Sequence, residues 1–242
     1  MEWTKDFSNL LFLDIETVSC CESYDLLEER LKVQWEKKAF RLNFDTPKEA
    51  LFLEKAGIYA EFGKIIVIGI GLFYKNEIGN LNFRVKSFSG INEKELLEAF
   101  IGLVHKFPSD KLYLCAHNGK EFDFPYLCRR MLVNGLKIPN ALNLRGKKPW
   151  EVKHFDTLEY WKFGDRKNYT SLELLAALFD IPGSKDEMDG SMVSEVFYKE
   201  KNIEKIAAYC CRDVVVTAQL FLKLHQMPLL QIENIEFSDV RK

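Results

Sequence analysis

The strongest constraint on the fold of this chain is an acidic residue in the apolar stripe of its last long predicted helix, residues 203–225. When that segment is projected at 3.6 residues per turn, one face is largely apolar, and Asp213 lies in the middle of it. A carboxylate is costly to bury unless a positive group meets it. The fold must therefore supply a cation, a nearby Arg or backbone N–H groups at this face. Tyr209 lies four residues earlier on nearly the same face, so its hydroxyl can reach the region beside Asp213.

Two further acids, Asp14 and Glu16, follow an apolar run at residues 10–13 that we interpret as a buried strand. Residues two apart on a strand point to the same face, so these carboxylates aim together. They also lie at the carboxyl end of the predicted strand, where open α/β sheets place ligands. Adjacent carboxylates repel each other, and a bound cation relieves that repulsion. Taken alone, the pattern fits a strand end that runs into solvent equally well.

The segment 117–123, with the sequence HNGKEFD, connects a predicted strand at 111–115 to a predicted helix at 124–133. Asp123 therefore lies near a helix start, where free N–H groups favour an anion. Its simpler interpretation is an N-cap of that helix. His117 is placed to contact a phosphate, although a histidine at a strand end more often has a structural role.

The three clusters together supply four carboxylates and one phenol: Asp14, Glu16, Asp123, Tyr209 and Asp213. Two strand ends and two helices can bring such groups to one edge of a sheet. Hard oxygen ligands without His or Cys suit Mg²⁺ or Mn²⁺ rather than Zn²⁺. Two such ions roughly 3.5–4 Å apart clamp the attacking and leaving oxygens of a phosphodiester. The combined cluster predicts metal-dependent phosphodiester chemistry.

The order of predicted elements indicates an α/β fold. Strands are expected at residues 10–13, 64–74, 81–88, 111–115 and 151–155, and helices at 93–105, 124–133, 170–179 and 203–225. Asn92 and Thr170 each precede a Glu by three residues and are predicted N-caps. Three early strands joined by hairpins, followed by alternating units, predict one domain over residues 1–242. It would contain a mixed five-stranded sheet with helices on both faces.

An insertion of about residues 22–60 separates the first two predicted strands and contains two predicted helices. Thr46 as N-cap, Pro47 at the first position and Glu49 at the third mark the start of the second helix. Because the insertion leaves the strand that carries Asp14, it can overhang the acids as a lid. A packing appendage is an equally good interpretation.

Composition limits the class of partner and the compartment. The net charge of −2 argues against a general basic coat, so nucleic-acid contacts must be local or mediated by bound cations. The six cysteines show no C-x-x-C pair and no zinc-ligand spacing, which indicates reduced thiols. The first six residues are polar, and no run approaches the roughly 18 apolar residues of a membrane span. We therefore expect a cytoplasmic protein without membrane contact.

With these residues the chain resembles the DEDD exonucleases, the DnaQ-like group with an RNase H-like fold. The group's three motifs have matches in order: Asp14-x-Glu16, Asn118-x-x-x-Phe122-Asp123 and Tyr209-x-x-x-Asp213. The second match has the form typical of family-B DNA polymerase proofreading domains, and the tyrosine in the third implies the DEDDy branch. The resemblance covers about residues 8–225 and is closest to stand-alone bacterial exonucleases related to that proofreading domain. No polymerase domain accompanies the motifs, so we expect no proofreading in cis.

The resemblance implies a role for each matched residue. Two Mg²⁺ or Mn²⁺ ions would bind to Asp14, Glu16, Asp123 and Asp213. Tyr209 would orient the attacking water. The predicted substrate contacts, to which His117 is added from its position, are Ile15, Thr17, His117, Asn118 and Phe122. The implied activity is hydrolysis of nucleic acid, single-stranded DNA in first place, from the 3′ end of DNA or RNA to nucleoside 5′-monophosphates.

Two non-catalytic functions stay open on the same fold, a nucleic-acid-binding module and an adaptor that works through the insertion. The binding module would lack a motif carboxylate or the tyrosine, and neither is missing here. The densest basic cluster, Arg145, Lys147 and Lys148, is hypothesised to track the incoming strand. His154 and Asp156 are more simply explained as a surface polar pair than as support for the site.

Overall fold

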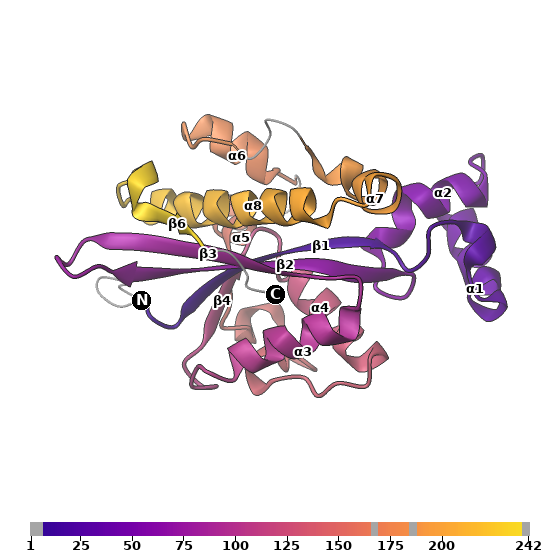
Figure 1. Cartoon of the computed structure of the whole chain (residues 1–242), viewed down its shortest axis with the longest axis horizontal. Coiled ribbons are helices and arrows are strands. Elements are labelled where there is room, and N and C mark those ends of the chain that lie inside the picture. The colour runs from indigo at the N-terminus through magenta and orange to yellow at the C-terminus, as the bar shows by residue number, and fades with distance from the viewer. Residues whose placement is uncertain (1–6, 166–168, 184–187, 239–242) are drawn as a thin grey trace.

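The structure of the protein, a computed structural model, describes residues 7–165, 169–183 and 188–238. In this part of the chain a six-stranded mixed sheet has the order β5-β4-β1-β2-β3-β6 (Figure 1). The antiparallel pairs are β1–β2 and β2–β3, and the parallel pairs are β1–β4, β4–β5 and β3–β6. The strands are β1 Leu10–Ser19, β2 Gly63–Lys75, β3 Leu81–Ser89, β4 Tyr113–Ala116, β5 Phe155–Asp156 and β6 Ile235–Phe237.

Helices cover both faces of the sheet, as the sequence predicts (Figure 1). The long helix α8 lies along one face with α6 and α7, α3 and α4 lie on the other face, and α1 and α2 extend beyond one end of β1. The helices are α1 Glu29–Leu42, α2 Lys48–Lys55, α3 Glu93–Val104, α4 Asp123–Val133, α5 Thr157–Lys162, α6 Leu172–Leu178, α7 Val193–Glu195 and α8 Ile203–Leu224.

The sequence predicts five strands, but the described residues form six, and two of the predicted strands have different boundaries in the structure. The sixth strand, β6, has only three residues, too few for a periodic pattern, and its partner β3 lies about 150 residues earlier in the chain, so that only the folded sheet reveals the pairing. The predicted first strand ends before Asp14, whereas β1 continues to Ser19 because β2 pairs with it along its whole polar half. Residues 151–155 were predicted as a strand, but only Phe155 and Asp156 pair with β4.

Two of the three predicted helix caps are also displaced. Asn92 caps α3 as predicted, since its side chain accepts bonds from the backbone of Lys94 and Glu95. Ser171, one residue after Thr170, supplies the side-chain cap of α6. Helix α2 begins at Lys48 with no side-chain cap, so Thr46 does not act as one. The two predicted helices of the insertion are both present.

The side chains of β1 alternate between two cores. Leu11, Leu13 and Ile15 pack with residues of α3 and α4. Leu10 and Phe12 face the other side and pack with residues of α8. Asp14 and Glu16 share the α8 face of the strand, because residues two apart point the same way. The sheet thus presents two acids to a helix that carries a third.

Two glycines of β2 let α8 approach the sheet closely. Gly69 is paired with Asp14 across the β1–β2 ladder. A Cβ at Gly69 would lie 2.8 Å from the Cys210 sulfur and 3.2 Å from the Cys210 carbonyl oxygen, and one at Gly71 would lie 2.9 Å from a methyl of Val214. The helix therefore rests on bare backbone at these positions, next to the strand that carries Asp14.

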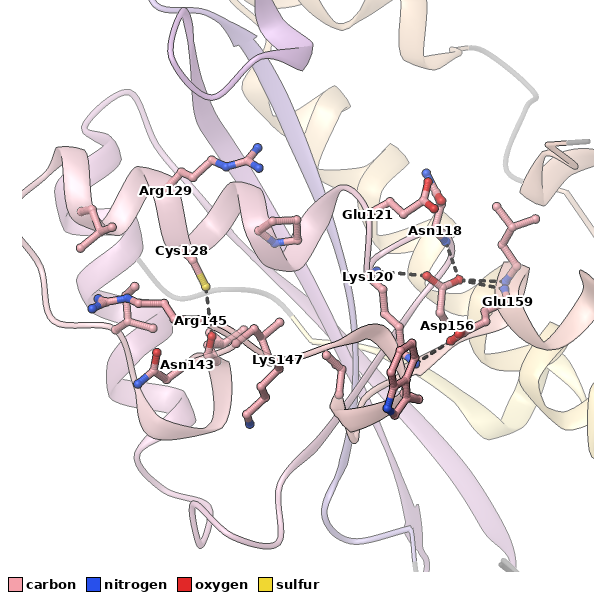
Figure 2. Close-up of a pocket in the computed structure, with 18 of the residues that line it drawn as sticks. Asn118, Lys120, Glu121, Cys128, Arg129, Asn143, Arg145, Lys147, Asp156 and Glu159 are labelled. Carbon is pink, nitrogen blue, oxygen red and sulfur yellow. Dashed lines mark hydrogen bonds and ion pairs between the residues drawn. The ribbon is translucent and has the colours of Figure 1, made fainter. Parts of the chain in front are cut away.

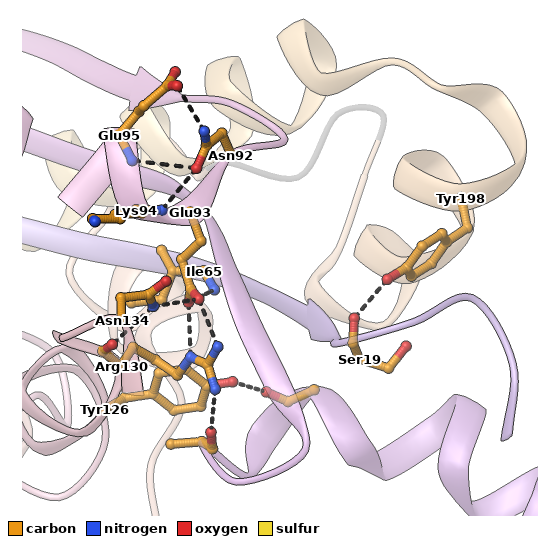
Figure 3. Close-up of polar contacts among 12 residues, drawn as sticks. Ser19, Ile65, Asn92, Glu93, Lys94, Glu95, Tyr126, Arg130, Asn134 and Tyr198 are labelled. Carbon is orange, nitrogen blue, oxygen red and sulfur yellow. Dashed lines mark hydrogen bonds and ion pairs between the residues drawn. The ribbon is translucent and has the colours of Figure 1, made fainter. Parts of the chain in front are cut away.

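On the opposite face, a buried ion pair fixes α4. The Arg130 guanidinium donates to both oxygens of Glu93, at 2.8 and 2.6 Å, and to the Ala60 carbonyl at 2.8 Å (Figure 3). Glu93 also accepts from the Ile65 N–H at 2.7 Å and from the Asn134 amide at 2.8 Å. Bidentate pairs of this kind hold a fixed geometry. They join α4 to α3, to β2 and to the end of the insertion.

The insertion packs around a hydrophobic cluster of its own. Trp35 of α1 and Phe52 of α2 are fully buried there, with Phe62 just before β2. The Trp35 indole N–H donates to the Lys48 carbonyl at 2.9 Å, which ties the two helices together. The insertion is therefore a packed unit at the end of β1.

We expect the substitution Gly69→Ala to lower the free energy of unfolding by about 1–3 kcal/mol, because the added methyl forces α8 away from β2. Urea denaturation measures this change. The control is Gly102→Ala, a glycine inside α3 whose Cβ would meet nothing within 4 Å. It should raise stability by about 0.5–1 kcal/mol. Equal stability of Gly69→Ala and the wild type would contradict the close approach described above.

Candidate active site

The acids of β1 lie in the middle of the strand, not at its end as predicted. Asp14 is half-buried and Glu16 is buried. A register shift between Glu16 and Thr17 marks a β-bulge directly beside them, a feature that often re-aims side chains near functional sites. The parallel pairing with β4 stops at Phe12, so one edge of β1 is open from Leu13 onwards.

Asp123 fills that open edge. It is the first residue of α4, and the N-cap position belongs to Phe122. The carboxylate of Asp123 accepts a hydrogen bond at 3.2 Å from the Ile15 N–H, a group that β4 is too short to pair. The second motif acid is thus bound to the backbone between the two acids of the first motif.

The third group comes from α8. The Tyr209 side chain is buried, and its hydroxyl donates a hydrogen bond to the Asp213 carboxylate one turn later. The Cys210 thiol lies 3.3 Å from a carboxylate oxygen of Asp14. The possible ligand atoms of Asp14, Glu16 and Cys210 all lie within 4.8 Å of one another. Helix and strand therefore meet at the acids, as the sequence predicts.

The charges of the four carboxylates act on one another. Burial and the charges of Glu16, Asp123 and Asp213 hold the pKa of Asp14 well above its ordinary value. The pKa of Glu16 is raised well above its ordinary value by burial and by the charges of Asp213 and Asp123. Burial raises the pKa of Asp123 to about 7 against two backbone hydrogen bonds that lower it. Among the described residues, no Arg or Lys lies within ion-pair distance of Asp14, Glu16 or Asp123.

The donor set fits divalent cations that prefer oxygen. Asp14, Glu16, Asp123 and Asp213 supply only carboxylate oxygens, the ligands that suit Mg²⁺ and Mn²⁺. Cys210 is the one soft atom in the cluster. Burial, together with the charges of Asp14 and Glu16, raises the pKa of its thiol well above the ordinary value. The sulfur thus remains a neutral S–H that donates to Asp14, and it is a poor metal ligand in this state.

The loop that leads to Asp123 is held by Asp156. Its carboxylate accepts hydrogen bonds from the backbone N–H of Asn118 at 2.9 Å and of Lys120 at 3.0 Å, besides capping α5 through Leu158 at 3.0 Å. Asn118 adopts a left-handed backbone conformation, with φ of 62°. Asn tolerates that conformation better than most residues. Asp156 therefore fixes the turn from which the second motif starts.

The residues predicted to contact substrate differ in how far their side chains and N–H groups are already bonded within the protein. The Ile15 side chain is in the core and its N–H is bonded to Asp123. Thr17 shares a side-chain hydrogen bond with Tyr126, whose ring lies 5.3 Å from that of Phe122. Both ring nitrogens of His117 have protein partners, the Thr157 hydroxyl at 2.8 Å and the Thr170 carbonyl at 2.9 Å. The contact of His117 with a phosphate stays a prediction, and it would require one of these two bonds to break.

Sequence reasoning misjudged four residues in or beside the site. Cys210 was read only as part of an apolar stripe, although its place between Tyr209 and Asp213 on the helix was a usable signal. Asp156 and His154, interpreted as a surface pair, are both buried. Tyr169 is the fourth: burial and the charges of Asp123, Asp156 and Asp14 raise the pKa of its phenol, which shows that it lies near these acids. No local pattern places that tyrosine beside the acids.

Comparison with known proteins gives the family. Residues 59–238 match a family described as "Predicted 3'-5' exonuclease related to the exonuclease domain of PolB". The chain belongs to this family. The match includes the second and third motifs and begins after the first, so β1 and its two acids lie outside the matched residues.

Archaeal DNA polymerases are similar to this family member over part of their length. A DNA polymerase of Pyrococcus glycovorans is 27% identical over 143 residues, 53% of this chain and 18% of the polymerase. DNA polymerase 1 of Pyrococcus abyssi is 26% identical over 178 residues, 66% of this chain and 22% of the polymerase. The chain thus spans about one fifth of the length of these curated relatives.

A solved structure supports the fold. The family B DNA polymerase from Pyrobaculum calidifontis superposes with a TM-score of 0.57 at 15% sequence identity. The likeness covers 89% of this chain and 24% of the polymerase. The RNase H-like α/β fold predicted from the motifs is confirmed. Among the described residues, no helix is both long and apolar enough to span a membrane.

We expect Mg²⁺ or Mn²⁺ to stabilise the protein more at about pH 8 than at about pH 6. Acids whose folded pKa is raised hold protons that the unfolded chain has lost, so the metal-free fold loses stability as pH rises through those values, near 7 for Asp123. Cations that replace the protons restore that stability. Thermal unfolding with Mg²⁺ or with EDTA at the two pH values measures the effect. An equal gain at both, or none, would contradict it.

Proposed function

We propose that the protein is a metal-dependent 3′→5′ exonuclease that hydrolyses nucleic acid, single-stranded DNA in first place, to nucleoside 5′-monophosphates. The observation that carries the proposal is the mutual approach of Asp14 and Glu16 of β1, Asp123 of α4 and Asp213 of α8, whose charges act on one another, with the Tyr209 hydroxyl bonded to Asp213. Membership of a family of predicted 3′→5′ exonucleases supports it.

In this proposal the four carboxylates hold two Mg²⁺ or Mn²⁺ ions, which would lower the pKa of the attacking water and neutralise the leaving oxygen when bound. The water oxygen attacks the phosphorus of the terminal phosphodiester, and the bond from phosphorus to the 3′-oxygen of the preceding nucleotide breaks. One proton of the water is lost from the attacking oxygen, and the released 3′-oxygen takes up a proton. The products are a nucleoside 5′-monophosphate and a strand shorter by one nucleotide.

Tyr209 orients the water rather than deprotonating it. Burial, and the charges of Asp213 and Glu16, raise the pKa of its phenol above the ordinary value, so the hydroxyl stays protonated at neutral pH. A protonated phenol that already donates to Asp213 can accept a hydrogen bond from the attacking water. Its buried ring fixes the direction of that bond.

Substrate positioning falls to the second-motif loop and to the bulged strand. Asn118 and Phe122 are half-buried on the loop that Asp156 holds, and the half-buried Thr17 follows the bulge of β1. A reacting phosphodiester must lie within about 3–3.5 Å of its nucleophile, so the rigidity of these supports contributes directly to the rate.

We expect Asp14→Ala to reduce hydrolysis by at least about 10³-fold, because the loss of a cation ligand removes several kcal/mol of transition-state stabilisation. The measurement is release of mononucleotides from end-labelled DNA and RNA oligonucleotides, single-stranded and 3′-recessed, with Mg²⁺, Mn²⁺ or EDTA. The control is Asp110→Ala, an exposed acid before the start of β4, whereas the second motif follows the other end of that strand.

Asp110→Ala should retain wild-type activity, and both variants should unfold at or above the wild-type temperature, since Asp14→Ala removes repulsion from the cluster. Hydrolysis by Asp14→Ala at the wild-type rate would refute the assignment. A wild-type protein that binds these oligonucleotides and cleaves none, with any of the cations, would instead favour the binding-module function.

We expect Tyr209→Phe to lower kcat by roughly 10²-fold and to leave KM nearly unchanged, because a misplaced reacting group costs about that factor. The ring and its packing are retained, so thermal unfolding should change little. Steady-state kinetics on a single-stranded oligonucleotide separates the two constants. A change confined to KM would show that the hydroxyl binds substrate instead of orienting water.

A further inference from the structure

A groove begins where the second-motif loop ends. It has a volume of about 790 Å³ and runs between α4, the segment before β5, and α5. Asn118 and Glu121 form one end of it, and Arg129, Arg145 and Lys147 line the other parts (Figure 2). The loop at the near end leads directly to Asp123, so a chain bound at the acids has the groove beside it.

The described residues that line the groove carry an excess of positive charge, with five Lys or Arg side chains against the acids Glu121, Asp156 and Glu159. Within the described residues, Arg129, Arg145 and Lys147 are exposed and form no ion pair, whereas Lys120 is paired with Glu159 at 2.5 Å. The field of the two arginines reaches the groove wall. The charges of Arg145 and Arg129 lower the pKa of the Cys128 thiol, but burial raises it more, so that the pKa is about 11. In a chain of net charge −2, such an unpaired cluster requires an explanation.

The floor and rim of the groove suit a nucleobase. Apolar side chains of Leu132, Ile138 and Leu142 line it. At the rim the Trp150 side chain is 77% exposed, with the Lys148 ammonium 5.2 Å from its ring centre. Proteins that bind single-stranded nucleic acids combine such groups: bases stack on the aromatic ring, and the cations bind the phosphates. A general apolar docking surface would not need the cations.

We propose that this groove binds the single-stranded part of the substrate, with Arg129, Arg145 and Lys147 on its phosphates and Trp150 stacked on a base. The inference rests on the proposed function and deepens it, because it assigns the strand a path away from the acids. It also gives the basic cluster before β5 a location, and adds Arg129, which lies in a different element and was not part of that cluster.

The test of the phosphate contacts is the triple substitution Arg129→Ala, Arg145→Ala and Lys147→Ala. Binding of a labelled oligothymidylate of about 12 nucleotides is followed by fluorescence anisotropy with Ca²⁺ in place of Mg²⁺, between about 50 and 200 mM salt. We expect affinity to fall at least tenfold. The slope of log affinity against log salt should decrease by about 2, because each single-strand phosphate contact contributes about 0.7.

The matched control removes three other exposed cations, in Lys94→Ala, Lys106→Ala and Lys111→Ala, near α3 and before β4. It changes the net charge equally and should leave affinity and salt slope nearly unchanged. Equal losses in the two triple variants would overturn the proposal, since they would reflect total charge only. Unchanged binding in the groove variant would overturn it as well.

Trp150→Ala tests the stacking contact. We expect roughly tenfold weaker binding, with most of it restored in Trp150→Phe. The gain in affinity from a dinucleotide to about 12 nucleotides should shrink in Trp150→Ala. If a mononucleotide binds as tightly as the long strand and depends equally on Trp150, the groove is a small-nucleotide site and the strand path is wrong.

A minimal substrate separates this proposal from the proposed function. The groove variants should hydrolyse the p-nitrophenyl ester of thymidine 5′-monophosphate at the wild-type rate, because that ester reaches only the acids. If the wild-type protein hydrolyses neither the ester nor the oligonucleotides, the proposed exonuclease function is refuted. A wild-type protein that hydrolyses both, beside a groove variant with unchanged oligonucleotide binding, refutes the groove alone.

Discussion

Mutual repulsion between carboxylates is the constraint around which this molecule is built. Burial and neighbouring charges raise the pKa values of Asp14 and Glu16. Bringing these ionised acids close to Asp213 therefore destabilises the folded state. This destabilisation is tolerable only because packing holds α8 against the sheet. Gly69, paired with Asp14, makes the approach close enough for the Cys210 thiol to donate to the Asp14 carboxylate.

The elements around the cluster oppose the repulsion without neutralising it. The buried Glu93–Arg130 pair locks α4, and with it Asp123, while the Ile15 N–H binds the Asp123 carboxylate directly. Asp156 holds the loop before Asp123 through backbone N–H groups. Among the described residues, no Arg or Lys pairs with Asp14, Glu16 or Asp123, and several line the groove that begins at the second-motif loop. An anionic strand and divalent cations would complement this separation of charge.

Several features were accessible from sequence because local chemistry decides them. The long helix α8 follows from its apolar periodicity, and the spacing of Tyr209 and Asp213 puts them on one face whatever the fold. Other features were not. β6 was missed because three residues form a strand only where β3 offers an edge, and β1 was cut short because the polar half of the strand owes its conformation to β2. The sequence also did not reveal the partners of His117, whose two ring nitrogens are hydrogen-bonded to Thr157 and Thr170.

By itself, the sequence determined the local spacing of the candidate groups: acids and a tyrosine on a strand, at a helix start and on a long helix. The tertiary structure alone decided that these groups meet, since the Ile15 N–H, next to Asp14, donates a hydrogen bond to the Asp123 carboxylate across 108 positions of the chain. It also decided what surrounds them, from Cys210 behind Asp14 to Asp156 behind the loop. The physical reason is that periodicity and capping act over a few residues, whereas burial, repulsion and close packing depend on neighbours that only the folded sheet brings together.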